Sequence, residues 1–132
     1  MGLRAQVRNM SSEQINVNEK KGLLKTLHDL IGQFIDGKYN KISLSFEEYL
    51  TLTDEEYSDF FGSFFDLESG TLNNLGEYLI ETFSYDIEDY EKCVIIKKKI
   101  SITYHYDESL NYVIHSIEGV TEKREINPLL CE

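Results

Sequence analysis

Residues 93–120 read CVIIKKKISITYHYDESLNYVIHSIEGV, and this stretch decides the fold class that the sequence predicts. Residues 93–106 and 110–120 are both rich in Ile, Val, Thr and Tyr, which favour β-strands. The polar segment Asp107–Ser109 between them predicts the loop of an antiparallel hairpin. The register that matches apolar residues pairs Tyr106 with Leu110, Tyr104 with Tyr112, and Ile102 with Ile114.

Helical patterns precede this hairpin. Residues 19–35 repeat apolar side chains at helical spacing, and Gly37 follows as a stop signal. Thr53–Glu56 is a capping box that opens a second helix with one aromatic and one acidic face. Residues 71–84 predict a third helix, with Leu72, Leu75, Leu79 and Phe83 facing inward. Residues 42–52 fit either a strand or a short helix, and residues 85–91 fit an acidic link.

Helices followed by strands predict an α+β fold, with about three N-terminal helices packed on a C-terminal antiparallel β-hairpin or small sheet. A lone hairpin is marginally stable, so Ile42–Phe46 or residues 121–127 are candidates for a third strand. The length of 132 residues predicts one domain over 1–132, in which residues 1–12 are poorly ordered. We expect a monomer, although a free hairpin edge would offer a site for self-pairing.

The most informative feature of the sequence is its uneven charge. The net charge is −11, and residues 42–91 carry 14 Asp and Glu without a single Lys or Arg. Residues 1–41 are net positive and residues 92–132 are neutral. The acidic stretch also holds 11 of the 16 aromatic residues. An ordinary surface mixes both signs, so a long stretch of one sign indicates a surface that attracts a basic partner.

Two interpretations of this stretch remain open. One is a solvated helical surface above an aromatic core, and the other is a docking surface with tyrosine anchors. The segment Tyr85–Tyr90 is the best local candidate for docking, because it has no clear core face. The predicted partner-binding residues are Glu47, Glu48, Glu55, Glu56, Asp59, Asp66, Glu68, Tyr85, Asp86, Glu88, Asp89 and Tyr90.

No catalytic or metal site is predicted. In the hairpin register above, His105 and His115 lie four residues apart, roughly 13 Å, which is too far for one metal ion or proton relay. We therefore expect no cofactor, no metal and no enzymatic activity. Alternation along Lys97–Lys99 sends Lys98 to the opposite face, and the net charge opposes direct nucleic-acid binding. Cys93 and Cys131 form no CxxC pair and are expected to be reduced and structural or incidental.

The sequence shows no signal peptide and no apolar run long enough to span a membrane. We therefore expect a soluble, cytoplasmic protein that does not bind membranes.

In composition, and in the acid-and-tyrosine segment Tyr85–Tyr90, the chain is similar to the broad class of bacterial immunity proteins. That similarity implies a non-catalytic inhibitor that occludes a basic toxin of the nuclease type. The alternative is a nucleic-acid mimic, such as a phage protein that blocks a host DNA- or RNA-binding machine. A small enzyme or ligand-binding α+β domain is a second alternative.

Overall fold

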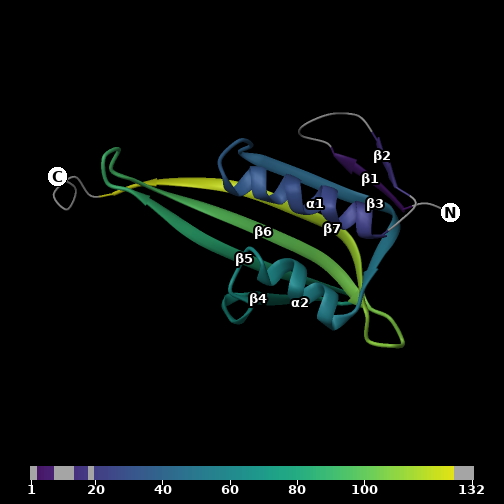
Figure 1. The fold of residues 1–132 in the computed structure, drawn as a ribbon. Helices are drawn as coiled ribbons and strands as arrows, with labels where there is room; N and C mark the ends of the chain where they lie inside the picture. The colour runs from purple at the N-terminus through teal and green to yellow at the C-terminus, as the bar shows by residue number, and fades with distance from the viewer. Residues whose placement is uncertain (1–2, 8–13, 18–19, 127–132) are drawn as a thin grey trace.

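The computed structural model describes residues 3–7, 14–17 and 20–126, with the backbone alone for residues 3–7, 14–17 and 47–49. These ranges form one antiparallel sheet of seven strands, in the order β2-β1-β3-β7-β6-β5-β4 (Figure 1). The strands are β1 (Leu3–Val7), β2 (Gln14–Val17), β3 (Lys41–Leu52), β4 (Thr71–Leu75), β5 (Tyr78–Asp89), β6 (Val94–Tyr106) and β7 (Tyr112–Glu125). The protein is therefore α+β, but the predicted arrangement of about three helices on a hairpin or small sheet is wrong.

The helix predicted over residues 19–35 is confirmed as α1, which spans Lys20–Ile35. Its core face is fully buried and consists of Leu23, Leu27, Ile31 and Phe34. Gly37 follows the helix with φ of 91°, a left-handed conformation that glycine adopts without strain. The local signals of apolar spacing and a terminal glycine therefore located this element.

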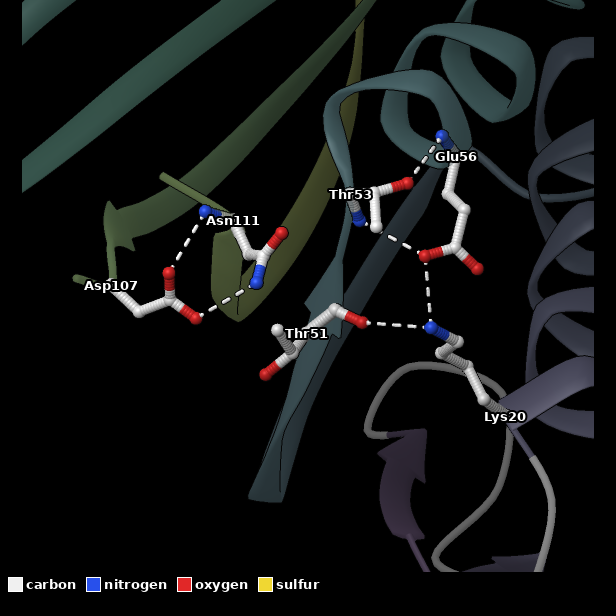
Figure 2. Close-up of polar contacts among 6 residues, drawn as sticks. All are labelled: Lys20, Thr51, Thr53, Glu56, Asp107 and Asn111. Atoms are coloured by element: carbon white, nitrogen blue, oxygen red, sulfur yellow. Dashed lines mark hydrogen bonds and ion pairs between the residues drawn. The ribbon is translucent and has the colours of Figure 1, made fainter. Parts of the chain in front are cut away.

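The capping box at Thr53 is also confirmed, and it opens α2, which spans Asp54–Gly62. The hydroxyl of Thr53 accepts from the amide of Glu56 at 3.1 Å, and the Glu56 carboxylate accepts from the amide of Thr53 at 3.0 Å (Figure 2). A short 3-10 helix, η1 (Leu67–Ser69), follows it. Both α-helices lie on the same face of the sheet, α1 over β3 and β7 and α2 beside β5 (Figure 1).

The third predicted helix, over residues 71–84, does not exist, because this segment forms β4 and the first half of β5. Leu75 pairs with Tyr78, which leaves Gly76 and Glu77 as a two-residue hairpin turn. Gly76 has φ of 83°, which this kind of turn requires. Leu72 and Leu75, assigned to a core face by the helical spacing, are 61% and 56% exposed. The predicted acidic link, residues 85–91, is mostly the second half of β5.

Strands β6 and β7 confirm the C-terminal hairpin, but the predicted register is wrong by two residues. Tyr106 pairs with Tyr112, and Tyr104 pairs with Ile114. The loop is five residues long because the Asp107 carboxylate accepts from the Asn111 amide at 2.9 Å and from its side-chain nitrogen at 3.2 Å (Figure 2). A bulge follows, because Thr103 pairs with Ser116 rather than with His115.

The core lies between the helices and one face of the sheet. It is built from α1, the aromatic side of α2, and alternate residues of β3, β5, β6 and β7. Lys98 projects into this face and is 2% exposed, as the predicted alternation of the lysine triplet requires. Its ammonium group donates to the hydroxyl of Thr121 at 2.8 Å and lies 4.6 Å from the centre of the Phe34 ring. Burial lowers the pKa of Lys98.

Three further expectations concern the N-terminal residues, the additional strands and the cysteines. Of residues 1–12, the structure describes Leu3–Val7, which form β1, and the remainder lies outside the described residues. Residues 42–52 belong to strand β3, and β7 continues to Glu125. Both segments proposed as additional strands, Ile42–Phe46 and residues 121–127, therefore contribute residues to the sheet. Cys93 is disulfide-bonded, so the expectation of a reduced thiol is wrong for this residue. Cys131 lies outside the described residues.

No helix in the described ranges combines the length and the apolar character needed to cross a bilayer.

Candidate protein-binding surface

The acidic face of α2 is the first part of the candidate surface. Glu55 and Asp59 lie four residues apart on the helix and are both exposed. Glu56 has a structural role instead, since its carboxylate completes the capping box and contacts the ammonium group of Lys20 at 2.9 Å (Figure 2). The hydrogen bond from the Thr53 amide and the nearby Lys20 lower the pKa of Glu56. Of the three predicted acids on α2, two are therefore available to a partner.

Asp66 and Glu68 extend this surface into η1, and both are exposed. The Asp66 carboxylate accepts from the amide of Glu68 at 3.1 Å, which caps the short helix. The segment between η1 and β4 packs closely on β5, because a Cβ atom placed on Gly70 would lie 2.5 Å from the Phe83 ring. The acids of η1 therefore border β5.

On β5 the predicted residues divide between the two faces of the sheet. Asp86 and Glu88 are exposed, and strand alternation places them on the face without helices. Asp86 lies opposite Lys97 of β6, which in turn lies opposite Glu122 of β7. These three residues border a shallow hollow of about 170 Å³. The acidic strand β5 is therefore next to a lysine, although the acidic segment of the sequence contains none.

The two tyrosines of the segment Tyr85–Tyr90 differ in exposure. Tyr85 is half-buried, with its ring centre 6.1 Å from that of Phe65, and burial followed by the charge of Asp36 raises its pKa. Tyr90 is 56% exposed in the β5–β6 turn, where its hydroxyl donates to Glu88, and this bond raises its pKa. Asp89 is half-buried and accepts from the amide of Lys92 at 3.2 Å. Tyr90 is therefore the better candidate for an anchor.

Glu47 and Glu48 lie apart from the other predicted residues. They belong to β3, in the stretch where its pairing with β7 is irregular, and their side chains are outside the described part of the structure. Strands β7 and β6 separate β3 from β5. The remaining ten predicted residues lie on α2, η1, β5 and the turn after β5, at the end of the sheet that β4 and β5 form.

A pair of histidines on β6 and β7 was missed by the sequence analysis. His105 Nδ1 and His115 Nε2 are 2.6 Å apart, so the predicted separation of roughly 13 Å is wrong. The bulge at His115, together with the two-residue shift in register, brings the two rings together. Glu77 and Tyr78 line the same hollow of about 300 Å³. Burial, followed by the charge of His105, lowers the pKa of His115.

The signal for this pair was present but ambiguous. Asp and Asn at the two ends of a five-residue loop favour the longer connection, whereas apolar matching favoured the shorter one. Within the described residues, no group of three or more His, Cys, Asp or Glu side chains is arranged to hold a metal ion.

Comparison with known proteins gives a likeness of fold. No protein-family model and no curated protein matches the chain. Among solved structures, the thermo- and acido-stable ORF-99 from the archaeal virus AFV1 is similar, with a TM-score of 0.65 and 19% identity over 81% of this chain and 99% of that one. ORF14 from Sulfolobus islandicus filamentous virus has a TM-score of 0.62 and 22% identity over 84% of this chain and 92% of that one. Both of these structures come from archaeal viruses, and neither comparison points to a bacterial immunity protein.

Proposed function

We propose that the protein is a small non-catalytic inhibitor that binds a basic, nucleic-acid-binding protein and covers its charged surface. The observation that carries this proposal is the concentration of one sign of charge. Residues 53–91 hold twelve carboxylates and no Lys or Arg. They form α2, η1, β4, β5 and their connections, which occupy one end of the sheet. Such a field speeds the approach of a partner with the opposite charge.

The exposed groups at this end suit recognition of Lys and Arg. Glu55 and Asp59 project from α2, while Asp86 and Glu88 project from β5. Carboxylates give stronger hydrogen bonds with cationic donors than neutral acceptors do. Tyr90 adds exposed apolar area beside Glu88, which is the combination that interface anchors commonly use.

Two settings fit this activity. Both similar structures come from archaeal viruses, so we favour a viral protein that mimics nucleic acid and blocks a DNA- or RNA-binding machine of the host. An immunity protein that neutralises a nuclease toxin is the other setting. A small enzyme or ligand-binding domain is a further candidate, for which the hollow at His105 and His115 would be the site.

The test begins with affinity purification of the tagged protein from host cells, followed by identification of the retained protein. We expect a basic nucleic-acid-binding protein that free DNA or RNA displaces in the mimic setting. The association rate is then measured at about 0.05 to 0.5 M NaCl for the parent and for Glu55→Lys with Asp59→Lys. We expect the charge reversal to slow association about tenfold or more at low salt and to flatten the salt dependence.

The matched control is Asp29→Lys with Glu118→Lys, which changes the net charge equally on α1 and on the middle of β7. This control should keep most of the parent's association rate. Equal rates for the two reversed proteins, or a retained partner that is itself acidic, would contradict the proposal.

A further inference from the structure

The outer edge of β5 is only half covered. Strand β4 pairs with Tyr78–Thr82, whereas β6 pairs with β5 along Leu79–Asp89. Gly70 and η1 pack against β5 at Phe83 and extend this cover beyond β4. In the part of the chain that the structure describes, Tyr85–Asp89 have no neighbouring strand on their outer side. A free edge of this kind presents alternate backbone N–H and C=O groups and is a template for another strand.

The side chains along this edge are acidic on one face of the sheet and partly apolar on the other. Asp86 and Glu88 are exposed on the face without helices, and Ile87 is 38% exposed on the helical face. Proteins commonly protect an edge with Lys or Pro, and residues 83–89 contain neither. Protection here comes from negative charge, which repels an acidic strand but not a basic one.

The charge pattern disfavours a second copy of this chain as the occupant of this edge. Antiparallel self-pairing centred on Ile87 would place Asp86 opposite Glu88 twice. Like charges directly opposite each other destabilise a strand pair. A basic strand would instead place its Lys or Arg side chains opposite Asp86 and Glu88. Strand β6 already shows such a pair, because Lys97 lies opposite Asp86.

We propose that the edge of β5 at Tyr85–Asp89 accepts one extended basic segment of the partner protein as an eighth strand of the sheet. Lys or Arg side chains of this segment lie opposite Asp86 and Glu88, and an apolar side chain lies beside Ile87. The added strand spans about five residues, roughly 17 Å. This inference rests on the proposed function and specifies how the partner attaches.

The first experiment uses a defined probe, an eight-residue peptide that alternates Lys and Val. Its binding to the full chain is followed by NMR and by amide hydrogen exchange. We expect shift changes and slower exchange at residues 85–89, and loss of binding when alternate peptide amides are N-methylated. Equal binding of the methylated peptide, or shifts confined to α2, would show a purely electrostatic contact and overturn the proposal.

The second experiment blocks the edge by mutation. Neighbouring residues of an edge strand direct their N–H groups to opposite sides, so one of Ile87→Pro and Glu88→Pro removes an outward donor and spares the pairing with β6. The variant that melts like the parent is taken forward. We expect it to bind the purified partner at least about tenfold more weakly through faster dissociation.

The outcomes separate this inference from the proposed function. Parental affinity in the proline variant overturns strand addition, while a basic partner and the effect of Glu55→Lys with Asp59→Lys would still support inhibition. A dimer of the parent that the proline variant abolishes overturns the inference in favour of self-pairing. A retained partner that is not basic removes the proposed function itself.

Discussion

At the scale of single residues, Gly119 determines how closely α1 approaches the sheet. It lies on β7, opposite Ile42 of β3, beneath the ring of Phe34. A Cβ atom at this position would lie 2.8 Å from Cγ1 of Ile42 and 2.9 Å from Cζ of Phe34. Such contacts are shorter than carbon atoms tolerate, so the absence of a side chain allows the helix to pack where it does.

Gly119→Ala is therefore expected to lower the free energy of unfolding by about 1–3 kcal/mol, measured by urea denaturation. Gly22→Ala is the matched control, because nothing lies within 4 Å of a Cβ atom at that position of α1. The control should gain up to about 1 kcal/mol from helix propensity. A Gly119→Ala protein as stable as its parent would contradict the packing described for Phe34.

We expect the histidine pair to make the stability of the protein depend on pH. Because burial lowers the pKa of His115 below its ordinary value of 6.5, the unfolded chain binds protons more readily than the folded one. The stabilisation is present above the unfolded pKa and is lost as pH falls toward the folded pKa. His105, Glu77 and Tyr78 border the His115 ring in this hollow.

We expect the melting temperature of the parent to fall between about pH 7.5 and about pH 5.5, and His115→Gln to reduce this fall. His28→Gln is the control, because it removes an exposed histidine of α1 that lies outside the pair. An unchanged pH dependence in His115→Gln would show that burial of this ring does not set it.

At the scale of elements, α2 depends on its first turn. The capping box satisfies amides that have no partner within the helix, and Asp54, Glu55 and Glu56 lie near the positive end of its dipole. Glu56 also joins the start of α2 to the start of α1 through Lys20, which donates to the carbonyl of Thr51 at 3.3 Å as well (Figure 2). One local motif therefore sets the helix start and links two elements.

Thr53→Ala removes the side-chain cap and is expected to cost about 1 kcal/mol of unfolding free energy. Thr26→Ala is the control, since the hydroxyl of Thr26 donates to the carbonyl of Gly22 in its own helix, at 3.1 Å. That control should be neutral or slightly stabilising. Equal losses in the two variants, measured by thermal melting, would contradict the capping role.

The elements also show which sequence signals were sufficient. Helices α1 and α2 followed from spacing and caps, which are local. Leu72, Leu75, Leu79 and Phe83 also have helical spacing, yet their segment forms two strands, because β5 pairs with β6 and β4 pairs with β5. That competition is decided by a strand distant in sequence, and the glycine of the tight turn at Gly76 was a local signal against a helix.

At the scale of the whole molecule, the acidic segment was recognised from the sequence, but its internal division was not. Glu56 and Asp66 serve as caps, and Tyr85 packs on Phe65. Glu47 and Glu48 lie on β3, away from the end formed by β4 and β5, because strand order is set by pairing between distant segments. The sequence located the charge, and only the fold separates structural acids from those that face a partner.

The bulge in β7 has a further consequence for how this protein tolerates changes in length. Ile114 and Ile117 both face the core although their spacing is odd. Losing one residue between them would restore regular alternation and leave both flanks of β7 facing as before. The same loss elsewhere in β7 would move the side chains on one side of the deletion to the opposite face of the sheet. Insertions and deletions among relatives should therefore concentrate at this position. Loss of the extra residue would separate the two imidazole rings without disturbing the hydrophobic interior.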